Sequence, residues 1–427
     1  MKWNEVIHES NSGLVTRHAL DWESLAEQIL HRGGSPEAVI DRLVELEIAV
    51  PSWGVCTGGT RFGRFPGPGE PRNVFEKLED VQAIHLLTGS TPRVSLHIPW
   101  DRIDRLHDLK YHADSLGLGF DAVNSNTFED QQGQPVSYKF GSLSHTDKAV
   151  RDLAVQHNIE VIEVGKALGS RALSIWIADG SSYPGQSHFR RAFERALDSY
   201  RRIYEALPSD WRVFIEHKPF EPACYSTVVA DWGISYVIAS ALGKKAACLV
   251  DLGHTPIGGN VEQTVAMLIQ ARKLAGFHFN DCKYADDDLT AGSINPYQLF
   301  LVFVELVLAA EEGVPDFDPA YLIDQSHNVK DPLEDLVQTV GNLQSAYARA
   351  LLVDREALAR YQESNDVLMA ELTLQEAFQT DVRPLIAEAR RRKGAALNPL
   401  AAFRASGYRS LKAKERPQSE KTSGTFQ

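Results

Sequence analysis

Short apolar runs recur through the middle of the chain and alternate with longer segments of helical periodicity. The runs are 48–53, 93–98, 118–123, 172–177, 211–216, 246–251, 276–280 and 321–324. Each is short and rich in apolar or β-branched residues, which is typical of strands buried on both faces. Eight alternations of strand and helix predict an α/β fold, a closed parallel (β/α)8 barrel (TIM barrel), over residues 46–330.

The segments between and around these runs predict the helices. Residues 188–206, 226–242 and 260–274 carry apolar residues at helical spacing, and the last has Glu262 in its first turn and Arg272 and Lys273 in its last. Residues 1–45 predict helices before the first strand, and 331–427 predict a C-terminal helical arm. We expect this arm to form a subunit interface rather than only to cap the barrel, and its polar, basic tail from about residue 410 to be disordered.

An open, doubly wound sheet is the alternative architecture for alternating strands and helices. That fold would place a glycine-rich phosphate loop directly after the first strand. The stretch TGGTRFGRFPGPGEPR at 57–72 is too long and too rich in proline and arginine to be such a loop. The sequence therefore favours the closed barrel.

Composition narrows the class of protein. The 427 residues are 43% hydrophobic, which supplies a large core, and the net charge of −13 argues against a nucleic-acid surface while favouring cations. Four cysteines without CxxC spacing indicate neither a disulfide framework nor a thiolate zinc site. The chain shows no apolar export signal and no uncharged apolar run of membrane-spanning length, so we expect a cytoplasmic protein with no membrane partner.

Carboxylate and imidazole side chains lie at or just beyond the ends of the last four strand-like runs. They are Glu216, Asp251, His254, His278, Asp286, Asp288 and Asp324. Any one of them could be an ordinary helix cap, turn or hydrogen-bonded histidine. Independent capping would not be expected to recur after four consecutive strands of one barrel. The strands of a parallel barrel end at one mouth, so the pattern predicts a site for a pair of divalent metal ions there.

Spacing assigns directions to some of these side chains. In WRVFIEHKPF, Glu216 and Lys218 are two apart on an extended segment and therefore share a face, while His217 points away. Asp286 and Asp288 alternate in the same way on the loop after the seventh run. An ion pair with the carboxylates is the alternative to a chemical role for Lys218.

Aromatic residues and one histidine lie at the ends of the first four runs or shortly after them. They are Trp53, His97, Trp100, Phe128 and Trp176. Aromatic rings stack on the apolar faces of a sugar, while an imidazole or a carboxylate such as Asp179 binds its hydroxyls. For Trp53 and Trp176, placed within strands, core packing is the alternative. The combination of metal ligands and aromatic rings predicts a carbohydrate-binding site.

Several segments together resemble the bacterial L-rhamnose isomerases, particularly their broad-specificity branch, which has a xylose-isomerase-like barrel. They are PSWGVCTGGTRFGRFPGPGEPR, VSLHIPWD, FDAVNSNTF, WIADGSSYPGQ, IEHKPFEPA, VDLGH, GFHFNDCKYADDDL, LIDQSHN and RPLIAEARRRKGAALNP. The likeness covers nearly the whole chain. Cys282 departs from it, because the family usually carries serine there.

The resemblance implies roles for the site residues. Glu216, Asp251, His278 and Asp324 would hold a structural metal ion, and His254, Asp286 and Asp288 a catalytic one, with Asp251 shared between them. Manganese is the usual ion in the family; a set of carboxylate and imidazole ligands also suits cobalt or zinc.

The resemblance also implies an activity. Aldose and ketose would interconvert by a metal-assisted hydride shift, with Lys218 binding O1, Asp324 relaying the proton and His97 binding the sugar during ring opening. Trp53, Trp100, Phe128 and Trp176 would line the pocket, Phe62 would act in a neighbouring subunit's site, and the assembly would be a homotetramer.

Three alternatives remain open from the sequence. A ketose 3-epimerase on the same barrel would use one metal and two opposed carboxylates as acid and base. A metal-dependent phosphodiesterase would want a basic groove and more histidine ligands. A non-catalytic sugar- or metal-binding protein would bind without turnover.

Overall fold

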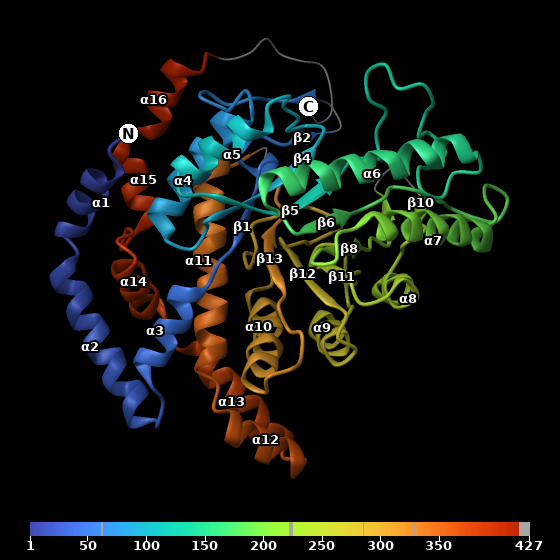
Figure 1. The fold of residues 1–427 in the computed structure, drawn as a ribbon. Coiled ribbons are helices and arrows are strands. Elements are labelled where there is room, and N and C mark those ends of the chain that lie inside the picture. Colours follow the sequence, from blue (N-terminus) through green and yellow to red (C-terminus); the bar gives the residue numbers. More distant parts are fainter. Residues whose placement is uncertain (61–62, 222–224, 285, 328, 418–427) are drawn as a thin grey trace.

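The predicted (β/α)8 barrel is confirmed. The computed structural model describes residues 1–60, 63–221, 225–284, 286–327 and 329–417, with a closed parallel barrel at their centre (Figure 1). Its strands, in chain order, are β1 (Ala49–Pro51), β4 (Arg93–Ile98), β5 (Gly119–Ser125), β6 (Ala172–Ile175), β8 (Arg212–Glu216), β11 (Ala246–Asp251), β12 (Leu274–Phe279) and β13 (Ala320–Ile323). Each apolar run of the sequence overlaps one of them, and β13 closes the ring by pairing with β1.

Helices follow the strands and cover the outside of the barrel. They are α4 (Val74–Thr88), α5 (Leu106–Ser115), α6 (Lys148–Leu168), α7 (Phe189–Ala206), α8 (Trp232–Leu242), α9 (Val261–Gln270), α10 (Pro296–Glu311) and α11 (Pro332–Leu351). Many begin at an Asn or Asp whose side chain accepts a backbone N–H of the first turn, as Asn73 does for α4 and Asp231 for α8. The caps fix where each loop at the mouth ends.

Two helix boundaries differ from the prediction. The segment 226–242 was expected to be helical throughout, but α8 begins only at Trp232, because Tyr225–Thr227 forms β10 of a small antiparallel sheet. Lys273 was placed in the last turn of 260–274, yet α9 ends at Gln270. The Lys273 ammonium instead donates to the carbonyls of Ala239, Gly243 and Ala246, and so caps the C-terminal end of α8.

The core has two layers that follow the alternation of side chains along the strands. A large cluster of buried apolar residues fills the space between the strands and the helices. A smaller cluster lies on the other strand face, inside the barrel: Ala49, Ala122, Ala172, Phe214, Ala247, Leu249, Ala275 and Leu322. The inside of the barrel is therefore packed below the mouth, as in other barrels of this kind.

Short elements surround the mouth. The loop after β1 holds the 3-10 helix η1 (Trp53–Val55) and the hairpin of β2 (Gly59–Thr60) and β3 (Gly63–Arg64). The strands β7 (Gly180–Ser181), β9 (Phe220–Glu221) and β10 form a three-stranded antiparallel sheet from the loops after β6 and β8.

The terminal helices pack on one side of the barrel. Three precede β1, as predicted: α1 (Trp3–Ser12), α2 (Val15–His31) and α3 (Pro36–Glu45). Five follow α11: α12 (Arg355–Glu363), α13 (Val367–Gln379), α14 (Arg383–Arg392), α15 (Pro399–Ser406) and α16 (Tyr408–Glu415). Because α14 packs on α2 and α3, and α15 on α1 and α4, much of the C-terminal arm covers its own chain.

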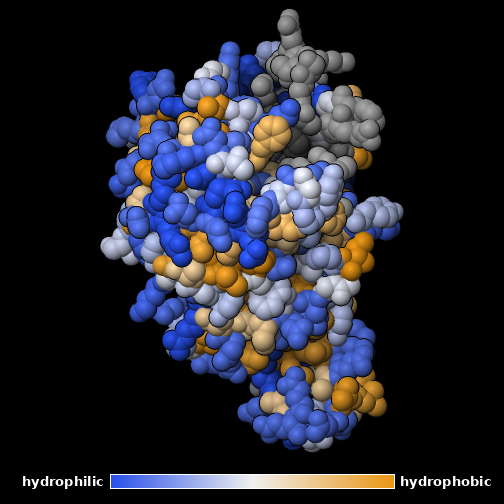
Figure 2. Space-filling view, turned by 90° about the vertical axis from the view of Figure 1, so that its right-hand side faces the viewer, coloured by the Kyte–Doolittle hydropathy of each residue, from blue (hydrophilic) through white to orange (hydrophobic). Residues whose placement is uncertain are grey.

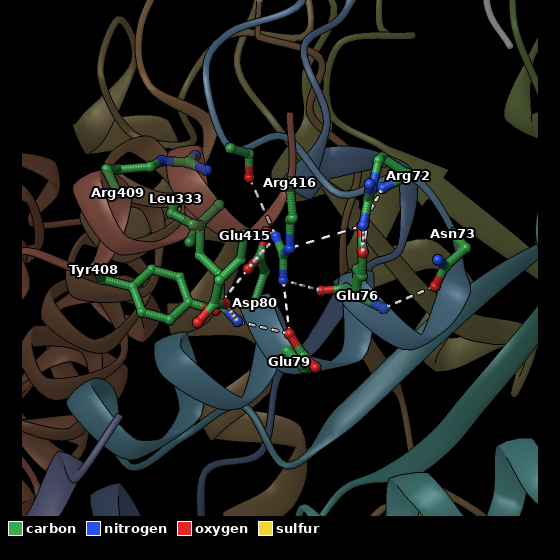
Figure 3. Close-up of polar contacts among 12 residues, drawn as sticks. Arg72, Asn73, Glu76, Glu79, Asp80, Leu333, Tyr408, Arg409, Glu415 and Arg416 are labelled. Carbon is green, nitrogen blue, oxygen red and sulfur yellow. Dashed lines mark hydrogen bonds and ion pairs between the residues drawn. The ribbon is translucent and has the colours of Figure 1, made fainter. Parts of the chain in front are cut away.

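The expected start of disorder at about residue 410 is wrong, because α16 folds onto α4 (Figure 3). The Arg416 guanidinium is buried and donates to both carboxylate oxygens of Asp80 at 2.9 Å, while the Tyr408 hydroxyl donates to the same carboxylate at 2.7 Å. Arg416 also donates to the Gly69 carbonyl, in the loop after β1. The polar composition of this segment therefore serves buried ion pairs, and breaking one of this kind costs about 3–5 kcal/mol.

The helices α12 and α13 project from the body of the molecule, and Figure 2 shows apolar residues gathered on this projection. Val367, Leu368 and Leu372 of α13 are exposed. Within the described residues, none of the helices combines the length and the apolar character needed to span a membrane.

Candidate metal centre and aromatic cluster

The inward faces of three strands each end in a carboxylate. On β8, Phe214 points inward and Glu216 is two residues later; on β13, Leu322 is followed in the same way by Asp324. On β11, Leu249 is followed by Asp251. The period of two therefore brings these carboxylates from the packed interior to the floor of the mouth.

His278 of β12 completes a first group of donor atoms. Its Nδ1 lies 3.1 Å from Glu216 Oε1, 3.4 Å from Asp324 Oδ2 and 3.9 Å from Asp251 Oδ2. The four donors lie within 4.8 Å of one another. Ligands held about 2.0–2.2 Å from a single ion lie up to about 4.4 Å apart, so shifts of a few tenths of an ångström would bring this group around one divalent ion.

A second group shares Asp251 with the first. Asp251, His254 and Asp286 offer donors that also lie within 4.8 Å of one another, with His254 Nε2 3.2 Å from Asp286 Oδ1. The other ring nitrogen of His254 lies 3.0 Å from the His217 carbonyl oxygen, the partner that fixes the tautomer of a metal-ligating histidine.

Asp288, expected as a ligand of the second group, lies beside it. Burial raises the pKa of Asp288 well above its usual value, and the charges of the neighbouring carboxylates, first Asp286 and then Asp324, raise it further. Asp287 faces elsewhere, as predicted from the alternation, and accepts the backbone N–H groups of Lys283 and Tyr284.

The electrostatics of the two groups are those of a cation site. Burial alone would lower the pKa of both histidines, but the surrounding carboxylates raise it to about 10 for His254 and about 9 for His278. Burial raises the pKa of Asp251 to about 7. Two imidazolium charges thus balance the carboxylates in the ion-free protein, and a divalent ion would replace them. Hard carboxylate and imidazole donors without thiolate suit manganese, cobalt or zinc.

Asn280 was missed by the sequence reasoning. Its amide donates to both oxygens of Asp251 at 2.9 and 3.0 Å, and its own carbonyl oxygen accepts the Gly253 N–H at 2.7 Å. A Cβ at Gly253 would lie 3.0 Å from Asn280 Oδ1, so a larger residue in the turn after β11 would press on Asn280. An asparagine just past a strand carries no signal of this role in the sequence.

Lys218 lies between the acidic cluster and an aromatic ring. Its ammonium is 2.6 Å from Asp286 Oδ2 and 4.9 Å from the centre of the Trp176 ring. The ion pair that was the alternative to a chemical role for Lys218 is thus present, and the ammonium is held at the site with little access to water.

The aromatic residues form one cluster on the opposite side of the mouth. The His97 ring stacks on Trp100 with centres 3.9 Å apart and meets Phe128 edge-on at 5.6 Å, and Phe128 meets Trp176 at 4.7 Å. The Trp53 ring lies 5.4 Å from His97, and its indole N–H donates to Asp324 Oδ1 at 2.8 Å. Trp53 and Trp176 lie just beyond β1 and β6 rather than within them.

The buried imidazole of His97 has an unused nitrogen. Within the described part of the chain, Nδ1 has no hydrogen-bond partner, and burial lowers the pKa of His97 well below its usual value. The backbone N–H of His97 donates to Asp101, a buried carboxylate that also binds the Lys77 ammonium at 2.6 Å. Asp101 and Lys77 were not predicted, because their contribution is to hold His97 rather than to face the cavity.

Two further expectations from the sequence have different outcomes. Asp179, expected to bind a hydroxyl, is saturated by the backbone N–H and hydroxyl groups of Ser142 and Ser144, and this expectation is wrong. Phe62 lies outside the described residues.

Comparison with known proteins identifies the class. No known family profile matches the chain. A probable sugar isomerase from Rhizobium meliloti is 60% identical over 397 residues, which cover 93% of this chain and 92% of that protein. The xylose isomerase of Thermus thermophilus is 25% identical over 264 residues, covering 57% of this chain and 67% of its own.

A solved structure agrees on the architecture. The 3-keto-D-glucoside 4-epimerase of E. coli matches with a TM-score of 0.52 at 12% identity, covering 70% of this chain and 100% of that one, a likeness that shows the fold alone. The chain therefore belongs to a family of sugar isomerases built on a xylose-isomerase-like (β/α)8 barrel.

Proposed function

We propose that this protein is a metal-dependent aldose-ketose isomerase that interconverts L-rhamnose and L-rhamnulose and also accepts other aldoses, among them D-allose, L-mannose and L-lyxose. The observation that carries the proposal is the pair of donor groups sharing Asp251 and facing the aromatic cluster. The sugar isomerase relative supports the reaction class. The choice of L-rhamnose rests on the sequence resemblance described above.

We assign two divalent ions to the mouth, with manganese as the first choice. Glu216, Asp251, His278 and Asp324 would hold one ion; His254, Asp286 and Asp288, with Asp251 shared, would hold the other. Bound there, the ions supply Lewis-acid polarisation of the two oxygens between which the carbonyl moves.

The reaction moves one hydride and one proton. In the aldose-to-ketose direction, a hydrogen leaves C2 with its electron pair and bonds to C1, while the O2 hydroxyl loses its proton and O1 gains one. Substrate and product are isomers, so no nicotinamide is consumed. The chain's own task is to hold C1 and C2 in place and to move that proton.

Three side chains suit this task. The Lys218 ammonium would donate to O1 as charge develops there, from its position beside Asp286. Asp324 is suited to relay the proton between O1 and O2, because burial raises its pKa and Trp53 fixes one of its oxygens. His97 would use Nδ1 to bind the ring oxygen or a terminal hydroxyl during ring opening.

The aromatic cluster would hold the carbon skeleton. Trp53, Trp100, Phe128 and Trp176 present apolar surface that suits the methyl end of a 6-deoxy sugar and excludes water from the reacting carbons. We place Phe62 at a neighbouring subunit's site in a homotetramer, with the exposed apolar residues of α13 as a candidate contact surface. Light scattering at working concentration tests the tetramer, and a stable monomer would remove it.

Isotope labelling tests the reaction. L-rhamnose with deuterium at C2 should give L-rhamnulose that keeps the label at C1, and a chelator should abolish turnover until Mn²⁺ is restored. Exchange of the label with water would instead indicate proton transfer, as in a ketose 3-epimerase. Sugar binding without turnover in the presence of Mn²⁺, Co²⁺ and Zn²⁺ would indicate a binding protein and reject the proposal.

A further inference from the structure

The first turns of α11, in the C-terminal arm, reach the back of the barrel mouth through a buried carboxylate. Asp335 Oδ1 accepts the Thr290 hydroxyl at 2.5 Å and the Lys330 ammonium at 2.8 Å, and Oδ2 lies 2.6 Å from His327 Nδ1. The Asp335 side chain is 2% exposed. Burial alone would raise the pKa of Asp335, but these partners hold it at about 2.

Thr290 ends the loop that carries Asp286 and Asp288. The base of this loop is closed by two backbone hydrogen bonds between Asp281 and Leu289, of 2.9 and 2.8 Å. Thr290 follows directly and is tied to Asp335, so the end of the loop is fixed to α11. The backbone of Asp288 lies in the left-handed region, with φ of 48°, a conformation that the rest of the loop must support.

A second contact from α11 reaches the same loop. The Thr339 hydroxyl donates to Gln325 Oε1 at 2.7 Å, and the Gln325 amide donates to the Leu289 carbonyl at 3.1 Å. Gln325 follows Asp324 in the chain. The loop after β12 and the loop after β13 are therefore joined to each other and to one helix.

His327 extends the network to the loop after β1. Its carbonyl oxygen accepts the Gly58 N–H at 2.5 Å, and Thr57 pairs with it as a parallel bridge. Trp53, in the same loop, donates to Asp324. Asp335 thus contacts side chains from two loops and, through His327, reaches the third.

We propose that Asp335 is a positioning residue that fixes the loop of Asp286 and Asp288 relative to Asp251 and Asp324, and so sets the geometry of the second donor group. The inference rests on the proposed function, because that group is the proposed site of the second ion. Asp335 acts through Thr290, His327 and Lys330 and touches neither the ion nor the sugar. An unbraced loop would let the donors of the second group move apart while the first group, on strand ends, keeps its shape.

Two variants test the proposal against a matched control. Asp335→Asn removes the charge with little change of shape, and Thr290→Val removes one hydroxyl, with Thr290→Ser as its conservative rescue. The control is Glu388→Gln, since Glu388 is also a buried carboxylate that pairs with a histidine, His18 at 3.0 Å, in the packing of α14 against α2.

Two measurements are made on the full chain. The first is a Mn²⁺ titration in which electron paramagnetic resonance measures the free ion, and the second is amide hydrogen exchange. In Asp335→Asn and Thr290→Val we expect one of the two ions to bind about 10- to 100-fold more weakly, the usual effect of losing a residue that orients ligands. Exchange should rise in residues 282–290 in the ion-free protein. Glu388→Gln and Thr290→Ser should leave both readouts near those of the unmodified chain.

The outcomes separate the two claims. The role of Asp335 would be overturned if neither Asp335→Asn nor Thr290→Val changed the hydrogen exchange of residues 282–290 or the affinity of either Mn²⁺ ion. That result would leave the proposed function intact. Failure of the unmodified chain to bind two Mn²⁺ ions would overturn the proposed function and this inference together. If Asp335→Asn does not fold, Thr290→Val against Thr290→Ser decides the question.

Discussion

The barrel mouth is divided into two halves of different chemistry. Strands β8, β11, β12 and β13 are consecutive in the ring and carry the carboxylates and imidazoles, while β6, β5, β4 and β1 complete the ring and lead into the aromatic cluster. The halves meet at two seams. At one, Lys218 lies over Trp176; at the other, Trp53 donates to Asp324.

The halves are stabilised by opposite means. Burial disfavours every charge in the acidic half, which exists only because imidazolium and ammonium groups offset the carboxylates. The aromatic half gains from burial, and its one imidazole, His97, stays neutral. The acidic half should therefore respond to pH and metal ions, whereas the aromatic half should respond to the shape of the sugar.

Removal of the shared carboxylate of Asp251 should give the largest loss of turnover, and it should disrupt metal binding in the acidic half without changing the aromatic half. In Asp251→Ala we expect turnover to fall on the order of 10³-fold, because both donor groups lose a member and the remaining carboxylates repel one another. Steady-state kinetics with metal analysis checks this, with Asp287→Asn on the neighbouring loop as control. Retained metal and turnover in Asp251→Ala would contradict the division of the mouth.

The acidic half should release protons when it takes up metal. At pH 7 the ion-free protein carries protons on His254 and His278, with pKa values of about 10 and 9, and in part on Asp251, with a pKa of about 7, so at least two protons should leave per chain on loading. Because each histidine belongs to a different donor group, the apparent affinity for each Mn²⁺ ion should rise by about tenfold per pH unit below pH 9. Calorimetry in buffers of different ionisation enthalpy measures the release, and a proton count near zero would disagree with the assigned ligands.

The same histidines set the pH dependence of stability without metal. Their pKa values are raised in the folded state, so their contribution is complete below pH 6.5 and is lost as pH rises through about 9 to 10. The chelated protein should therefore melt at a lower temperature at pH 10 than at pH 7. The reverse order in calorimetric scans would contradict these pairings.

Truncation of a side chain in the aromatic half should weaken sugar binding and leave Mn²⁺ binding unchanged. In Phe128→Ala we expect KM for L-rhamnose to rise about tenfold, since the sugar would lose a ring contact worth on the order of 1 kcal/mol and His97 and Trp176 would lose a ring that packs against them. The Mn²⁺ affinity of Phe128→Ala should not change. The KM of Phe128→Leu should lie between those of the unmodified chain and Phe128→Ala. A weakened metal site would show that the halves are coupled here.

At the seam between β1 and β13 we expect an effect of similar size, on kcat rather than on KM. Trp53→Phe removes the hydrogen bond to Asp324 but keeps an aromatic ring, and a single neutral donor to a carboxylate is worth about 1.5–3 kcal/mol at most. We expect kcat to fall by about tenfold with KM nearly unchanged, because Asp324 keeps its place but loses its orientation. Equal changes in both constants would indicate general damage to the pocket.

Residues on strands were predictable, and residues on loops less so. The barrel strands follow from short apolar runs, and Glu216, Asp251 and Asp324 follow from the period of two. Ser226 and Thr227 of β10 were assigned to a helix because strand pairing across loops leaves no local pattern. Asp179 resembled the ligands in type and place, yet its partners Ser142 and Ser144 lie 37 and 35 residues away in the chain.

The composition of the C-terminal segment led to a wrong expectation of disorder from about residue 410, for a related reason. A polar, basic segment predicts disorder when its charges face water, but Arg416 finds Asp80 and Glu79 on α4, more than 300 residues earlier. The roles of Asn280 and Asp101 were missed because they contact other side chains rather than the cavity. Positions whose function is to hold another residue need the fold before they can be recognised.

The attachment of α16 to α4 and to the loop after β1 has a consequence for biosynthesis. During translation, α16 leaves the ribosome only after every barrel strand has been made, so Asp80 waits without its guanidinium partner while the rest of the domain forms. The nascent chain therefore carries Asp80 without this partner until Arg416 has been made, and the hydrogen bond from Arg416 to the Gly69 carbonyl, in the loop after β1, also forms only then.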